Sequence, residues 1–77
     1  MKIEKFVALI AEEFDETAPE LFNPNTRYKE LNEWGSLIAL SIIAIIDEEF
    51  EIRITGADLS NCDTLNDLFT LVESRNV

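Results

Sequence analysis

The sequence contains no histidine, one cysteine, two glycines and two prolines among its 77 residues. Without histidine, the chain lacks the usual general base of enzymes and the commonest metal ligand. Its one cysteine, Cys62, excludes an internal disulfide and offers no metal-ligand spacing. So few glycines and prolines argue against a many-turned β fold and favour helices. We therefore expect a small all-α protein that holds no metal and is not an enzyme.

Long apolar runs are also missing. The longest stretch, residues 37–46, is interrupted by Ser41 and is too short to span a bilayer. The first five residues, Met-Lys-Ile-Glu-Lys, contain no continuous apolar run of the kind that a signal peptide needs. We expect no membrane insertion and a reducing, cytoplasmic location.

Basic residues are scarce: 6 Lys and Arg stand against 16 Asp and Glu, which gives a net charge of −10. Such a field repels nucleic acid and anionic membranes, and it attracts proteins that carry Lys and Arg patches. Acidity also keeps a small protein soluble, so the charge by itself identifies no partner. The chain is long enough for one domain, residues 1–77, with a modest core that buries roughly 60% of the surface of the unfolded chain.

The apolar pattern predicts three longer helices and one short helix. Apolar residues at three- and four-residue spacing predict a first helix over residues 2–15, and a second runs from 36 to about 51 without internal Gly or Pro. A short helix around residues 57–60 follows Thr55 and Asp58, and a last helix follows Thr64 and Asp67; both pairs have the spacing of a capping box. The stripe of the last helix is Leu65, Leu68, Phe69 and Val72.

Between the first two helices lies a connection, residues 15–35, that is unusually long for so small a domain. Connections of this length are often functional. It contains both prolines, and four apolar residues have the potential to attach it to the core: Leu21, Phe22, Tyr28 and Leu31.

Ser36 opens the second helix directly after Glu33-Trp34-Gly35. At a helix start the unpaired backbone N–H groups and the positive end of the dipole favour an anionic substituent. A phosphodiester on Ser36 is therefore physically reasonable. Serine is also a common N-cap residue, so position alone does not distinguish a modified serine from a structural one.

The second helix is apolar over much of its circumference. At 100° per residue, one side contains Ala39, Ile43, Ile46 and Phe50, which we assign to the core. The other side is a candidate surface for partner docking, because an exposed apolar patch usually marks an interaction site. Its residues are Leu37, Ile38, Ser41, Ala44, Ile45 and Glu48. The alternative is a central helix that is buried nearly all round.

The segment Trp34-Gly35-Ser36-Leu37, followed by an apolar helix and then Asp47-Glu48-Glu49-Phe50-Glu51-Ile52, resembles the acyl carrier protein family. Tyr28-Lys29-Glu30-Leu31 is similar to the family's approach to its serine. Ile54, the segment 57–60 and Asp63-Thr64-Leu65-Asn66-Asp67-Leu68 are similar to the family's third and fourth helices. The resemblance covers essentially the whole chain, and the order and spacing of its parts carry it.

The resemblance implies an acyl-carrier-like four-helix bundle without catalysis of its own, and a monomer. A phosphopantetheinyl transferase, using coenzyme A and Mg²⁺, would attach a 4'-phosphopantetheine arm to Ser36. The terminal thiol of the arm would then hold acyl, aryl or aminoacyl groups as thioesters for transferring enzymes of a biosynthetic pathway. A carrier of fatty-acyl chains would enclose the acyl chain among its helices. The corresponding residues here are better interpreted as a plain core: Ile43, Ile46, Phe50, Ile54, Leu59, Cys62 and Leu68.

Two departures from the family pattern narrow this expectation. Gly35 stands where the family normally has Asp before the serine, so modification requires a transferase that does not need this carboxylate. Ile38 and Ser41 stand where fatty-acid carriers typically have acidic residues, so docking should depend more on apolar contact. We expect a role in fatty-acid-like or specialised biosynthesis, and these departures favour a specialised pathway. The alternative function is an unmodified, carrier-like interaction module.

Overall fold

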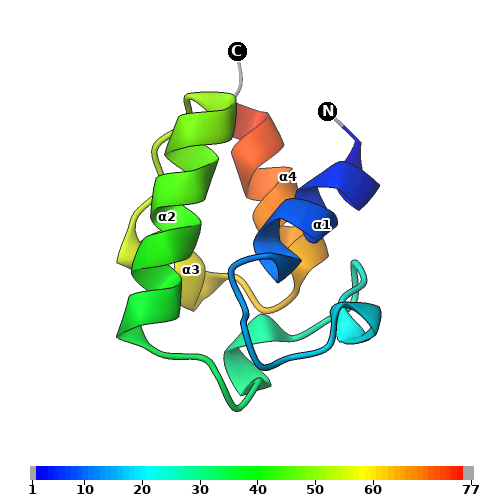
Figure 1. The fold of residues 1–77 in the computed structure, drawn as a ribbon. Helices are drawn as coiled ribbons and strands as arrows, with labels where there is room; N and C mark the ends of the chain where they lie inside the picture. The colour runs from blue at the N-terminus through cyan, green and yellow to red at the C-terminus, as the bar shows by residue number, and fades with distance from the viewer. Residues whose placement is uncertain (1, 76–77) are drawn as a thin grey trace.

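The computed structural model describes residues 2–75, which form four α-helices without β-strands. These are α1 (Ile3–Ala11), α2 (Ser36–Phe50), α3 (Gly56–Asn61) and α4 (Leu65–Arg75), with two short 3-10 turns, η1 (Pro19–Leu21) and η2 (Tyr28–Glu30), between α1 and α2. The prediction of three longer helices, one short helix and a long connection is confirmed. In Figure 1, α2 lies along one side of the bundle, and the long connection crosses the end at which α2 begins. No helix within residues 2–75 has both the length and the apolar character needed to cross a membrane.

The first helix is shorter than the predicted span of 2–15. It ends at Ala11, and the chain then tightens: the N–H of Glu13 donates to the carbonyl of Ile10 (3.0 Å) and that of Phe14 to Ala11 (3.1 Å). Phe14 remains buried. The apolar spacing identified burial correctly, but Phe14 reaches the core from a turn, which the spacing cannot distinguish from one more turn of helix.

Both predicted capping boxes are present. In α3, the N–H of Asp58 donates to the Thr55 hydroxyl (3.1 Å) and the N–H of Thr55 donates to the Asp58 carboxylate (2.8 Å). Thr64 and Asp67 make the same reciprocal pair at the start of α4, with both distances at 3.1 Å. The Arg75 guanidinium and the backbone of Thr55 lower the pKa of Asp58 to about 2, so this carboxylate stays charged throughout the physiological range.

The core lies where α1, α2 and α4 meet, since α1 packs against both α2 and α4 while α3 packs against α2. Phe6 is fully buried at this junction, and its ring contacts those of Phe50 (centroids 6.1 Å apart) and Phe69 (5.4 Å). The largest fully buried side chains are Tyr28, Phe6, Ile10, Ile42, Ile46, Leu59, Leu65, Leu68 and Val72.

The long connection is attached to the core mainly through Tyr28 and Phe22, which are buried, while Leu31 is half-buried. Leu21 is 59% exposed, so the expectation that it helps to attach the connection is wrong. Leu21 is the last residue of η1, and this short turn directs Phe22 into the core while the Leu21 side chain faces solvent. The Tyr28 hydroxyl donates to the carbonyls of Leu59 (2.6 Å) and Cys62 (3.2 Å), and burial raises the pKa of this hydroxyl.

We expect Tyr28→Phe to lower the free energy of unfolding by about 1–2 kcal/mol, because two carbonyls at the end of α3 lose their buried donor. Urea unfolding followed by circular dichroism measures the effect. Ser74→Ala is the matched control: it removes a hydroxyl that donates to the Leu71 carbonyl (2.6 Å) at an exposed position, where water replaces it. The control should change the free energy by less than about 0.5 kcal/mol. Equal effects of the two variants would contradict the importance of Tyr28.

Candidate functional site

Ser36 is the first residue of α2 and is exposed to solvent. Gly35 is the N-cap residue, and it contributes no side-chain hydrogen bond to the helix. The first bond of the helix runs from the N–H of Ala39 to the carbonyl of Gly35 (2.9 Å). The N–H groups of residues 36–38 therefore precede the helical ladder and have no partner within it. These three N–H groups are free hydrogen-bond donors at the start of α2, where they are suited to binding an anion.

The space around Gly35 is open. A Cβ atom added to Gly35 would meet nothing within 4 Å, and its φ of 179° is extended backbone that any residue adopts. Neither the conformation nor the packing therefore requires glycine at this position.

Glu33 fixes the segment that leads into Ser36. Its carboxylate accepts hydrogen bonds from the N–H groups of Asp15 (2.9 Å) and Glu16 (2.8 Å) and from the hydroxyl of Thr17 (2.9 Å). Partial desolvation opposes the charged form of Glu33, but these hydrogen bonds outweigh it and lower the pKa of the carboxyl. The sequence does not reveal this role, because a lone glutamate has no local pattern that indicates partners 16 to 18 residues away.

Trp34 provides a second attachment next to the site. Its ring is half-buried and contacts Tyr28 edge-on, with centroids 5.1 Å apart and an interplanar angle of 64°. The backbone N–H of Trp34 donates to the Leu31 carbonyl (3.0 Å). Ser36 therefore follows a segment whose side chains are held on two sides, while Ser36 itself remains free.

The faces of α2 differ from the expected ones by a rotation of the helix. Ile42 and Ile46 are fully buried and lie at the centre of the core face. On the predicted core face, Ala39, Ile43 and Phe50 are half-buried. Two of the residues predicted to face outward, Ile38 and Ile45, are half-buried and pack against the core. Periodicity could not locate the centre of the core face because apolar residues occupy most of the circumference of this helix.

Leucines lie at the centre of the exposed side of α2, which overlaps the predicted docking surface. Leu37 is 81% exposed, and Ala44 and Glu48 are also exposed, as predicted, while Ser41 is half-buried. Leu40, which is 62% exposed, was missed. Residues 37, 40 and 44 are three and four positions apart, so they lie on one face of the helix. The sequence contains this spacing, but the spacing identifies an exposed face only when the buried face of α2 is known. We call Leu37, Leu40 and Ala44 the α2 apolar face.

The predicted acyl pocket coincides with packed core. Ile46, Ile54, Leu59 and Leu68 are buried. Ile43, Phe50 and Cys62 are half-buried. None of the seven lines either of the two hollows described in residues 2–75, so the pocket stays a prediction. Burial raises the pKa of the Cys62 thiol, which makes it a poor nucleophile and fits a packing role.

Comparison with protein families connects this geometry to a function. The family model described as the phosphopantetheine attachment site matches residues 4–72. The chain belongs to this family. Its members are non-catalytic carriers that bear a covalently attached 4'-phosphopantetheine on a serine. As a carrier, the chain is expected to interact with a phosphopantetheinyl transferase and with biosynthetic enzymes in general. No curated protein and no solved structure matches the chain significantly.

We expect Gly35→Asp to stabilise this carrier relative to Gly35→Ala by about 1 kcal/mol, because an aspartate at the N-cap accepts a hydrogen bond from the first turn of α2 and alanine does not. The open space at Gly35 accommodates both side chains, so the comparison isolates capping. Urea unfolding at moderate salt, which screens the added charge, measures the difference. An aspartate variant no more stable than the alanine variant would contradict the described start of α2.

Proposed function

We propose that this chain is a carrier of acyl, aryl or aminoacyl groups in a specialised biosynthetic pathway, with its phosphopantetheine attached to Ser36. The observation that carries the proposal is the position of Ser36: an exposed hydroxyl on the first turn of the longest helix, within the residues that match the family. The N–H groups of the first turn favour the charge of a phosphodiester, and the exposure of Ser36 to solvent leaves its hydroxyl accessible.

The other serines suit attachment less well. Ser41 is half-buried in the middle of α2. Ser74 donates its hydroxyl to the Leu71 carbonyl within α4. Ser60 is exposed, but it lies near the end of the short helix α3, where the dipole disfavours an anion.

The residues before Ser36 fix the position of the backbone, and Ser36 itself provides the point of attachment. Glu33 and Trp34 hold the approach to the serine, so the attachment point has a defined position relative to α2. The arm, when bound, supplies a thiol at the end of a flexible tether, on which a substrate is carried as a thioester. Tethering keeps the substrate at a high effective concentration near each enzyme that binds the carrier.

Partner enzymes that act at Ser36 contact the α2 apolar face, which lies next to the serine. Leu37 and Leu40 are the large apolar side chains exposed near the serine, and the first turn of α2 contains no acidic residue. Contacts made by such a surface depend on apolar burial and change little with salt. This supports partners other than those that recognise the acidic face of fatty-acid carriers.

An unmodified interaction module is the second candidate. Gly35 favours it, because the carboxylate that normally precedes the serine in the family is missing, while the α2 apolar face would still serve for docking. The two candidates differ in whether Ser36 becomes modified.

Incubation with coenzyme A, Mg²⁺ and a broad-specificity phosphopantetheinyl transferase should add the mass of one phosphopantetheine to the intact protein. Intact-mass spectrometry measures the gain. Ser36→Ala should gain nothing, and Ser60→Ala, the matched control at another exposed serine, should be modified normally. Gain by Ser36→Ala would show that another residue is the site. If several transferases fail on the wild type, the carrier function is wrong and the interaction module is favoured.

Leu40→Ser should lower kcat/KM of the transferase for the carrier by about tenfold, which corresponds to the loss of one well-buried interface side chain. Leu21→Ser is the matched control, since Leu21 is similarly exposed (59%, against 62% for Leu40) but lies in η1. The control should stay within about twofold of the wild type. Because both leucines are exposed, neither change should unfold the protein, which circular dichroism checks. Equal losses in the two variants would refute docking through the α2 apolar face.

A further inference from the structure

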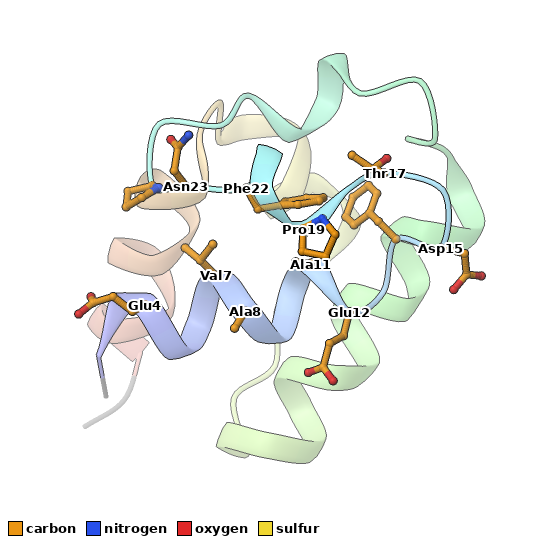
Figure 2. Close-up of a pocket in the computed structure, with 12 residues that line it drawn as sticks. Glu4, Val7, Ala8, Ala11, Glu12, Asp15, Thr17, Pro19, Phe22 and Asn23 are labelled. Carbon is orange, nitrogen blue, oxygen red and sulfur yellow. The ribbon is translucent and has the colours of Figure 1, made fainter.

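A hollow of about 670 Å³ lies between α1 and the segment 14–24, and its lining includes no residue of α2. Figure 2 shows α1 along one side of this groove and the segment with η1 along the other. The apolar residues that line it are Val7, Ala8, Ala11, Phe14, Pro19, Phe22 and Pro24. We call it the α1 groove. It is a surface separate from the serine and from the α2 apolar face.

Short side chains on α1 create the hollow. Ala8 and Ala11 lie one helical turn apart, so nothing from α1 fills the space above them. Phe14 and Phe22 close the floor, with ring centroids 5.0 Å apart. The groove thus has a packed apolar floor, of which only small parts of the Phe14 and Phe22 side chains remain exposed.

Hydrogen bonds hold the wall opposite α1 at both ends. At one end, Glu33 accepts from the N–H groups of Asp15 and Glu16. At the other end, the carbonyl of Pro24 accepts from the N–H of Asn66 in α4 (2.8 Å). A wall fixed in this way keeps the groove formed without an occupant, so binding costs little ordering entropy.

The polar groups of the groove indicate the chemistry of its occupant. The Thr17 hydroxyl donates to Glu33, and the Asn23 side-chain oxygen accepts from the N–H of Asn25 (2.8 Å). The remaining polar side chains of the lining are three exposed carboxylates, and none of the lining residues is Lys or Arg. In Figure 2 these carboxylates, which belong to Glu4, Glu12 and Asp15, extend from the edges of the groove rather than into it. A small ligand would need several polar groups that converge on it, whereas this arrangement suits apolar side chains flanked by cations.

We propose that the α1 groove is a second docking surface, which binds a basic amphipathic segment of a partner protein. Apolar side chains of the segment occupy the space over Ala8 and Ala11, and its Lys and Arg side chains pair with Glu4, Glu12 and Asp15. Because the groove shares no residue with the α2 apolar face, a partner can remain bound there whether or not Ser36 is modified.

The first test uses a fluorescent helical peptide of leucine and lysine with one apolar face, and a peptide of the same composition in which the leucines form no face. The amphipathic peptide should bind the full chain more tightly at physiological salt, as measured by anisotropy. Ala8→Arg, at an exposed position of α1, should weaken binding by about tenfold, and Ala44→Arg on the α2 apolar face by less than about twofold. Equal binding of the two peptides, an equal effect of the two variants, or a larger effect of Ala44→Arg would overturn the proposal.

The second test separates the carboxylates at the groove from the overall charge. Glu12→Lys and Glu49→Lys change the net charge equally, and both residues are exposed, but only Glu12 lines the groove. Glu12→Lys should weaken binding of the amphipathic peptide at least about fivefold more than Glu49→Lys. Equal weakening would show that the peptide responds only to the net charge of −10, which would also overturn the proposal. Neither test depends on modification of Ser36, so failure here is distinct from failure of the carrier function.

Discussion

Burial of Tyr28 is the constraint on which the arrangement of this small protein depends. Its ring is fully buried, and its hydroxyl donates to two carbonyls at the end of α3, more than thirty residues away. A connection of some two dozen residues is entropically costly to order, and a domain of this size has little core with which to offset that cost. One large side chain that is both apolar and hydrogen-bonded joins the connection to the helices, and Trp34 then packs on its ring beside Ser36.

The positions of the serine and of the α1 groove follow from the same attachment. Glu33 lies five residues beyond Tyr28 and accepts hydrogen bonds from the far end of the connection, so one carboxylate fixes both the approach to Ser36 and one end of the groove wall. These hydrogen bonds hold the segment before Ser36, whereas an arm attached at Ser36 would extend into solvent. A carrier benefits from this division, since its tether must move between enzymes and its docking surfaces must keep one shape.

Local features of the structure could be predicted from the sequence with success, and non-local ones could not. The bounds of α2 and the two capping boxes depend on neighbouring residues, and they were predicted correctly. The end of α1 was misplaced because Phe14 is buried from a turn rather than from a helix. The position of Ser36 at a helix start was predictable for the same local reason. Leu40 was missed because the face of α2 that turns inward depends on what packs against it.

By itself, the sequence determined the helical class, the order of the helices, the acidic charge and the serine at the start of the longest helix, since spacing, capping and composition act over a few residues. The tertiary structure alone decided the rotation of α2, the partners of Glu33 and Tyr28, and the existence of the α1 groove. Each of these joins residues that are far apart along the chain. Such contacts form only where the packing of several helices places two surfaces together, and no pattern within a single segment encodes that placement.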